Sequence, residues 1–263
     1  MKYNNAHNIP YLLGKTPSDD EQHQDGAESV SSKSENAENK NSVDDEEKQR
    51  ENERLQMLKY AEVVNETLNR KTNKKIIHIA AFYGSADSIG ILLEYGADPK
   101  AKLKGTRLTA LHLAAQFGHL DACKVLVEHP KAWKNKRALL ARDNKRRIPL
   151  ILAVMNGHLD VVKWMLSTGC PAYTKDSSEN SAIHYAAGYG WNDILQCLMA
   201  APFADPGVFN MWKLSPFFIA MIKGHDLCAS TLLETPSFDV NATDSDGKSI
   251  LHYMVCACCL YPK

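Results

Sequence analysis

A short apolar motif recurs six times along the chain at nearly constant spacing, and this periodicity restricts the possible folds more than any other feature. Successive copies are separated by 33 to 39 residues. The fourth residues of the copies are His78, His112, Ile151, His184, Phe218 and His252. Self-similarity with a period of about 20 to 50 residues is typical of proteins built from stacked units. One such unit cannot bury its apolar face alone, so the copies are expected to share one elongated core.

Each copy continues with the same succession of residue types. Two small or apolar residues, two variable residues and a glycine follow in residues 80–84, 114–118, 153–157, 186–190 and 220–224. The small residues allow helices to approach closely, and the glycine ends a helix because a left-handed conformation costs least without a Cβ atom. A second amphipathic helix follows, and a turn such as Gly96-Ala97-Asp98 leads to the next copy. Each copy therefore predicts a pair of helices.

These residues resemble the ankyrin repeat in three motifs: the box that starts the first helix, the Gly-His pair that ends it, and the Gly-Ala-Asp turn. The motifs occur at Thr109-Ala110-Leu111-His112, Gly118-His119, Gly157-His158, Gly224-His225 and Gly96-Ala97-Asp98. The resemblance covers residues 73–263. It implies an all-α ankyrin-repeat solenoid, in which each repeat has two antiparallel helices and a projecting hairpin finger. It also implies that the box histidines are structural: His78, His112, His184 and His252.

The expected array has about five full repeats and a truncated sixth. Their approximate bounds are 73–104, 105–143, 144–176, 177–210, 211–244 and 245–263. The last segment is too apolar for a terminal repeat, which needs a polar outer face. We therefore expect an array that is cut short: a fragment, a splice product, or a chain that needs a partner.

The residues before the repeats predict two different segments. Residues 1–50 are rich in Glu, Asp, Ser, Asn and Lys and carry few large apolar groups, so an acidic disordered tail is expected. In residues 51–72, apolar residues recur at spacings of three and four: Leu55, Leu58, Ala61, Val64 and Leu68. This pattern favours an amphipathic helix that caps the repeats over a solvated charged helix.

The longest gap between copies is basic. Its patch consists of Lys134, Lys136, Arg137, Arg142, Lys145, Arg146 and Arg147. A solvated loop with a finger is the simplest interpretation. Three binding partners stay open for the patch: an acidic partner surface, a nucleic acid or the acidic tail. The patch could also be a nuclear-import signal. Trp133 is the one aromatic residue in this segment, and the whole chain has equal numbers of basic and acidic residues, so a nucleic acid is disfavoured but not excluded.

Most finger turns lack the glycine that Gly247 provides in the last copy. The equivalent residues are Arg107, Arg146, Glu179 and Lys213. A residue with a Cβ atom either adopts a strained left-handed conformation here or forms a different turn. We therefore expect irregular fingers.

In a stacked array, the variable residues at the ends of the first helices face the concave side. The candidate partner-binding groove consists of Phe82, Tyr83, Gln116, Phe117, Met155, Asn156, Tyr189, Ile222 and Lys223. Aromatic residues are favoured anchors in protein interfaces. The same rings could instead pack on adjacent repeats, and both interpretations stay open. The expected function is a scaffold that binds a protein partner through this groove.

No motif in the sequence predicts a catalytic, cofactor or metal site. Glycine-rich phosphate loops, nucleophile elbows and His/carboxylate metal helices are lacking. The cluster of Cys256, Cys258 and Cys259 lacks the two separated ligand pairs of a structural zinc site, so core cysteines are favoured. The seven cysteines and the polar N-terminus favour a reduced, intracellular protein, cytoplasmic or nuclear, without a membrane span.

The fifth repeat also resembles the ankyrin segment of large invertebrate-type poly(ADP-ribose) polymerases. The similar stretches are 210–216, 223–225 and 238–242. The resemblance implies an alternative function, the regulatory or targeting segment of a longer NAD⁺-dependent ADP-ribosyltransferase whose transferase domain is missing here. An ankyrin-bearing cation channel is another possible parent.

Overall fold

The computed structural model describes residues 35–131, 134–235, 243–249 and 251–253, without the side chains of 35–47 and 134–136. The chain divides into two units, Met1–Val63 and Val64–Lys263. Residues 1–34 of the expected tail and the cluster of Cys256, Cys258 and Cys259 lie outside the described residues.

The first unit contains one long helix, α1 (Glu35–Val64). It begins within the segment that was expected to be a disordered tail, and it ends before residue 72. Leu55 and Leu58 of its apolar stripe are 48% and 62% exposed. The capping role of this helix stays a prediction, as does an interaction of the acidic tail with the basic patch.

Residues 65–72, which were predicted to be helical, form a turn that resembles the fingers. The Leu68 N–H donates to the carbonyl of Lys74 at 2.9 Å, and the side chain of Asn69 accepts from the Lys71 N–H at 2.9 Å. Asn73 has a positive φ of 53°. An asparagine that hydrogen-bonds to the backbone two residues later favours a turn over a helix, which is why the helix ends early.

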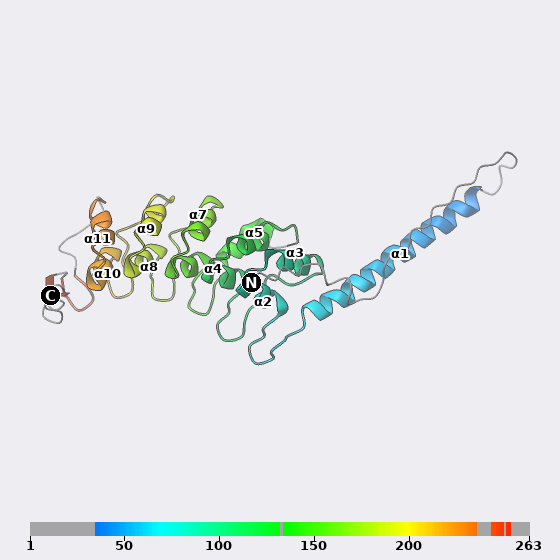
Figure 1. The fold of residues 1–263 in the computed structure, drawn as a ribbon, viewed down its shortest axis with the longest axis horizontal. Helices are drawn as coiled ribbons and strands as arrows, with labels where there is room; N and C mark the ends of the chain where they lie inside the picture. Colours follow the sequence, from blue (N-terminus) through cyan, green and yellow to red (C-terminus); the bar gives the residue numbers. More distant parts are fainter. Residues whose placement is uncertain (1–34, 132–133, 236–242, 250, 254–263) are drawn as a thin grey trace, which may run out of the picture. The chain divides into compact units, whose positions relative to one another are not determined.

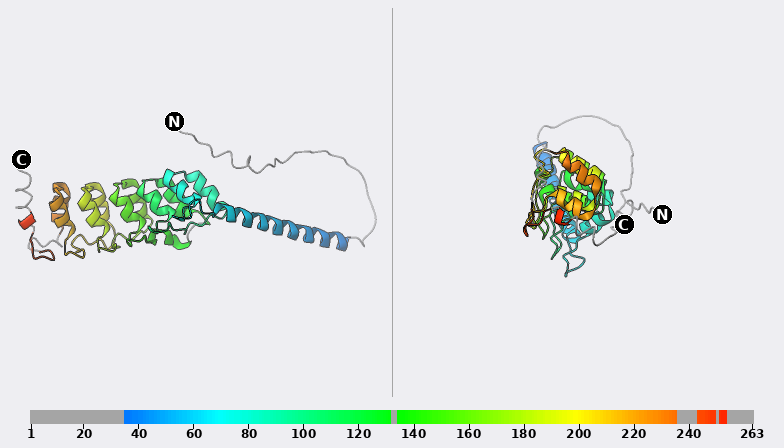
Figure 2. Two further views of the ribbon diagram at one scale, coloured as in Figure 1. Left: turned by 90° about the horizontal axis from the view of Figure 1, so that it is seen from below. Right: turned by 90° about the vertical axis from the view of Figure 1, so that its left-hand side faces the viewer.

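The second unit is a stack of helix pairs, drawn in Figure 1. The inner helices are α2 (Ile76–Tyr83), α4 (Ala110–Gln116), α6 (Pro149–Met155), α8 (Ala182–Tyr189) and α10 (Pro216–Lys223). The outer helices are α3 (Ala86–Glu94), α5 (Leu120–Glu128), α7 (Leu159–Ser167), α9 (Asn192–Met199) and α11 (Asp226–Leu233). Each helix packs on its counterpart in the next repeat, and Figure 2 shows the two layers from the end of the stack. The predicted all-α solenoid is confirmed.

The core runs along the stack without interruption. The small residues of the repeated motif line it at Ala80, Ala114, Ala153, Ala186 and Ala220. Four of them are completely buried, and Ala80 is 8% exposed. Side chains this small allow neighbouring inner helices to pack closely, so each inner helix is covered by the adjacent repeats.

The basic insertion is more ordered than a solvated loop. Its residues Lys134–Leu140 form a 3₁₀ helix, η2, which contacts α5 and α6. Ala138 and Leu139 from this helix are buried in the core, at 1% and 3% exposure. These two apolar side chains anchor the insertion between the second and third repeats.

The fingers are regular, so the expectation of irregular fingers was wrong. Arg107, Arg146, Glu179 and Lys213 have φ angles of 54° to 61°, in the same left-handed region as Gly247 at 75°. A left-handed conformation costs a residue with a Cβ atom about 1–2 kcal/mol. Hydrogen bonds within and between the fingers offset that cost.

The finger of the third repeat shows these compensating bonds. Oδ1 of the buried Asp143 accepts from the backbone N–H groups of Lys145 and Arg147, both at 2.8 Å. The Asn144 N–H donates to the carbonyl of Thr106 in the preceding finger at 2.9 Å. Bonds to a charged acceptor each contribute about 1.5–3 kcal/mol, enough to hold Arg146 in its turn.

Candidate protein-binding surface

The box histidines join each helix start to the next finger. Nδ1 of His112 accepts from the Thr109 N–H at 3.2 Å, and its Nε2 lies 3.2 Å from the carbonyl oxygen of Arg147. In the fourth repeat, His184 has the same contacts with Ser181 at 3.1 Å and Leu214 at 3.2 Å. A ring that accepts at Nδ1 and faces a carbonyl at Nε2 is neutral and carries its proton on Nε2. Burial lowers the pKa of both histidines to about 4.

The structural role implied for His78 has the same geometry, with Nδ1 accepting from the Lys75 N–H at 3.2 Å and Nε2 3.1 Å from the carbonyl of Ala101. In the sixth copy, Nδ1 of His252 accepts from the Ser249 N–H at 3.1 Å.

A second set of histidines connects neighbouring inner helices, a role that was not predicted from their position in the Gly-His pair. Nε2 of His119, His158 and His225 lies 2.9 to 3.1 Å from a carbonyl oxygen near the end of the preceding inner helix. Each ring also lies against the glycine that ends that helix. At Gly157 the indole of Trp191 takes this place. The recurrence of the Gly-His pair was the feature of the sequence that could have indicated this contact.

The groove residues lie at the carboxyl ends of the inner helices, with differing exposure. Tyr83 is 71% exposed and Tyr189 48%, whereas Phe117 packs on Phe82 with ring centroids 4.5 Å apart. Gln116 and Met155 are half-buried, and Asn156, Ile222 and Lys223 are exposed. The row of groove residues is therefore interrupted. It divides into a cluster around Phe82 and a pocket that contains Tyr189.

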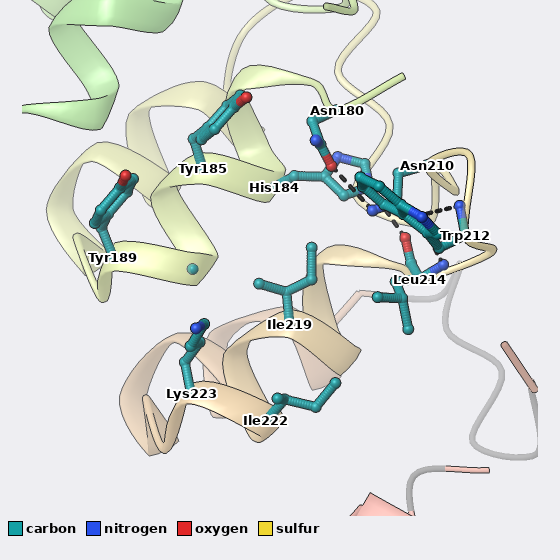
Figure 3. A pocket seen from close by; sticks show the side chains of 11 residues that line it. Asn180, His184, Tyr185, Tyr189, Asn210, Trp212, Leu214, Ile219, Ile222 and Lys223 are labelled. Atoms are coloured by element: carbon teal, nitrogen blue, oxygen red, sulfur yellow. Dashed lines mark hydrogen bonds between the residues drawn. The ribbon is translucent and has the colours of Figure 1, made fainter. Parts of the chain in front are cut away.

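The pocket has a volume of about 420 Å³ and is formed by α8, α10 and the finger that precedes α10. It is lined by Asn180, His184, Tyr185, Gly188, Tyr189, Asn210, Trp212, Leu214, Ile219, Ile222 and Lys223. Figure 3 shows Tyr189 and Lys223 at one end of the pocket and Trp212 at the other. Three predicted groove residues are thus brought together, and Trp212, Tyr185 and Ile219 are additions to the predicted set.

The position of the pocket follows from one glycine. Gly188 occupies the variable position that holds Phe82, Gln116, Met155 or Ile222 in the other repeats. A Cβ atom on Gly188 would lie 3.0 Å from Cγ2 of Ile219, so any larger side chain would enter the space beside α10. The other repeats carry a larger residue at the corresponding position. The glycine at this position, where the other repeats carry a side chain, was the feature of the sequence that could have indicated the pocket.

Hydrogen bonds hold the polar walls of the pocket in place. Oδ1 of Asn210 accepts from the backbone N–H groups of Trp212 and Leu214, both at 3.0 Å, and its Nδ2 donates to Asn180 Oδ1 at 3.0 Å. The Tyr185 hydroxyl donates to Oδ2 of Asp176 at 2.6 Å. Burial and this carboxylate raise the pKa of Tyr185. These groups shape the pocket and are already hydrogen-bonded.

The predicted basic patch is only partly available for binding. The guanidinium of Arg147 pairs with the buried Asp143, with Nη2 2.7 Å from Oδ2, so Arg147 stabilises its finger. Arg137, Arg142, Lys145 and Arg146 are exposed. The side chains of Lys134 and Lys136 lie outside the described residues.

The described residues contain no group of three His, Cys, Asp or Glu side chains that could hold a metal ion. Within the same ranges, none of the helices has the length and apolar character needed to cross a membrane. Cys123 and Cys170 are buried, and burial raises the pKa of each thiol to about 12. Such thiols are protonated at neutral pH and are poor nucleophiles or metal ligands.

Comparison with known proteins places these features in a family. The family described as "Ankyrin repeats (3 copies)" matches residues 50–138, 77–176, 133–210 and 150–244. Poly [ADP-ribose] polymerase tankyrase of Caenorhabditis elegans is 40% identical over 79 residues, which are 29% of this chain and 4% of that protein. Rabankyrin-5 of Mus musculus is 28% identical over 115 residues, 44% of this chain and 10% of that protein.

The matched part of the chain spans at most a tenth of the length of these relatives. The match to tankyrase agrees with the weaker resemblance noted from the sequence. Ankyrin repeats are protein–protein interaction domains and are generally not catalytic. The family matches together cover well over half of the sequence, and they agree with the stacked helix pairs and their histidine contacts. The chain therefore belongs to the ankyrin-repeat family.

Proposed function

We propose that the chain is a non-catalytic module that binds a segment of a partner protein in the groove at the carboxyl ends of its inner helices. The observation that supports this most is the pocket of about 420 Å³ beside Gly188, because a stacked core does not need an open apolar cavity at its surface. Pockets of about 300–1,000 Å³ with mainly apolar walls are typical binding sites.

The exposed aromatic residues of the groove support the same function. Tyr83 is 71% exposed and Tyr189 48%, so both rings keep accessible surface, although Tyr83 also contacts Phe82 edge-on with ring centroids 5.1 Å apart. A tyrosine or tryptophan buries a large area in a complex while few torsions are fixed. Phe117 is 41% exposed, and its ring packs on Phe82 of the preceding repeat with centroids 4.5 Å apart, so we assign it to packing between repeats.

A double substitution, Tyr83→Ala with Tyr189→Ala, is expected to lower the affinity for the partner by about ten-fold or more, in the range of interface hot spots. The melting temperature should change little, since both rings are exposed. Partners captured from a lysate of the source cells are identified by mass spectrometry, and the affinity of the leading partner is then measured by calorimetry.

Two control variants separate binding from packing. Tyr173→Ala removes a tyrosine that is 57% exposed but does not line the pocket, and it should leave binding unchanged. Phe117→Ala removes a packing ring and should lower the melting temperature. Unchanged capture of every partner by the double variant would refute the proposed groove.

A second candidate function is the targeting segment of a longer enzyme. It is favoured by the 40% identity with the poly(ADP-ribose) polymerase over 79 residues. Sequencing the transcript beyond the codon for Lys263 tests it. An open reading frame that encodes a transferase domain would support this function, and an immediate stop codon would contradict it.

A further inference from the structure

The walls of the pocket beside Gly188 are suited to a large apolar side chain. Ile219 and Ile222 from α10 face Tyr185 and Tyr189 from α8, and the Trp212 ring lies at the end formed by the finger (Figure 3). The polar groups of Asn180, Asn210 and Tyr185 bond to one another or to neighbouring groups of the chain. A partner side chain therefore meets mainly aromatic and aliphatic carbon inside the pocket, and burying an apolar side chain there is favourable.

The rim of the pocket carries two hydrogen-bond donors, the Lys223 ammonium and the Trp212 indole N–H. Lys223 is the one charged side chain among the described residues that line it, since His184 is neutral. Among the described contacts, none pairs the Lys223 ammonium or the Trp212 indole N–H with an acceptor. An ammonium and an indole N–H can only donate hydrogen bonds. Both side chains are exposed, so a ligand that covers these donors has to replace water as their acceptor, and the positive charge of Lys223 favours a carboxylate.

We infer that this pocket receives a large apolar side chain of a partner peptide, while an acidic residue next to it in the peptide binds Lys223. The inference rests on the proposed function and specifies the chemistry of the partner at that site. The two parts of the ligand match the two ends of the pocket: the apolar side chain lies between Trp212 and Ile219, and the carboxylate lies beside Lys223 and Tyr189 (Figure 3).

Other ligands fit these groups less well. A cationic side chain could stack on Trp212, but no carboxylate lines the pocket and Lys223 would repel it. A nucleic acid or an anionic lipid surface is usually held by several basic residues, and the pocket has one lysine. An acidic peptide with an apolar anchor satisfies both the apolar walls and the two donors at the rim.

The test uses the ¹⁵N-labelled full chain and small acetylated, amidated peptides. In one set, Phe is followed directly, or after one glycine, by Glu. In two matched sets, Gln or Lys replaces Glu. The indole N–H resonance of Trp212 is assigned by its loss in Trp212→Phe and reports on the pocket. The Glu peptides should shift it and bind about two- to five-fold more tightly than the Gln peptides at low salt, as expected for an exposed ion pair.

Matched variants test the two halves of the inference separately. Lys223→Gln should abolish the preference for Glu over Gln, whereas Lys163→Gln, at an exposed position on α7, should retain it. Gly188→Gln places in the pocket the residue that the second repeat carries at Gln116, and it should prevent binding of all the peptides. Amide spectra away from the pocket establish that each variant is folded. If Gly188→Gln does not fold, the comparison of Lys223→Gln with Lys163→Gln still tests whether Lys223 binds the acidic residue of the peptide.

The inference is overturned if the Trp212 resonance does not move with any peptide, or if Glu and Gln peptides bind the natural chain equally. This failure is separable from that of the groove itself. If partner capture depends on Tyr83 and Tyr189 although no peptide reaches Trp212, the groove stands and only the ligand chemistry is wrong.

Discussion

Lowering the pH from 7 to 5 is expected to reduce the free energy of unfolding by about 4 kcal/mol, through His112 and His184 together. Both rings are neutral in the folded chain, where burial lowers the pKa of each to about 4, compared with the ordinary value of 6.5. Each contributes about 2 kcal/mol of this loss. Burial also lowers the pKa of His78, which changes stability in the same direction.

The direction of this effect follows from proton binding. Between pH 6.5 and pH 4 the unfolded chain binds more protons at these two positions than the folded chain does, so acid favours unfolding. A protonated ring could not accept the backbone N–H of Thr109 or Ser181 at Nδ1, and those buried groups would lose their partner. The loss of stability therefore begins as the pH falls below 6.5 and is complete near pH 4.

Urea unfolding at a series of pH values measures the effect, and NMR titration of the imidazole C–H groups tests its cause. Stability at pH 7 and pH 8 should agree closely, since neither ring titrates in that range. If the rings of His112 and His184 titrate near pH 6.5 in the folded chain, the explanation is wrong. A stability that stays constant down to pH 5 would contradict it as well.

Gly118→Ala is expected to destabilise the chain by about 2–3 kcal/mol. Gly118 has a φ of 76°, and a Cβ atom there would lie 2.5 Å from Nδ1 of His158. The ring cannot move away without cost, because its Nε2 lies 2.9 Å from the carbonyl oxygen of Gln116. The substitution therefore combines backbone strain with the loss of a contact between two repeats.

Gly224→Ala is the matched control for this substitution. Gly224 ends the fifth inner helix with a φ of 74°, but within the described part of the chain no atom lies within 4 Å of a Cβ atom built there. Backbone strain alone should cost about 1 kcal/mol. Urea unfolding at pH 7 gives both values. Equal losses would show that the histidine contact does not couple the repeats as described.

Much of the fold could be predicted because each repeat depends on its own residues and its nearest neighbours. The spacing of His78, His112 and His184 identified the repeat, and the small residue after each box identified the buried side of the inner helix. Local preference failed where tertiary contacts outweighed it. Arg146 adopts a glycine-like conformation because Asp143 and the neighbouring finger hold the turn, and Ala138 and Leu139 convert an expected loop into a packed 3₁₀ helix.

The candidate site divides in the same way. The variable residues before each helix-ending glycine were predictable as groove residues from their position in the repeat, and Tyr83 and Tyr189 are exposed there. Their grouping was not predictable. Phe117 packs on Phe82, while Tyr189 joins Trp212 from the next finger around the space left by Gly188.

The repeat, the helix pairs and the family could be read from the sequence, because they follow from short-range patterns that recur in register. The place where a ligand could bind became evident only from the packing of the repeats. The pocket depends on side chains from α8, α10 and the intervening finger, and on one position where a side chain is missing. No periodic pattern encodes such an arrangement, since it arises from the departure of one repeat from the others.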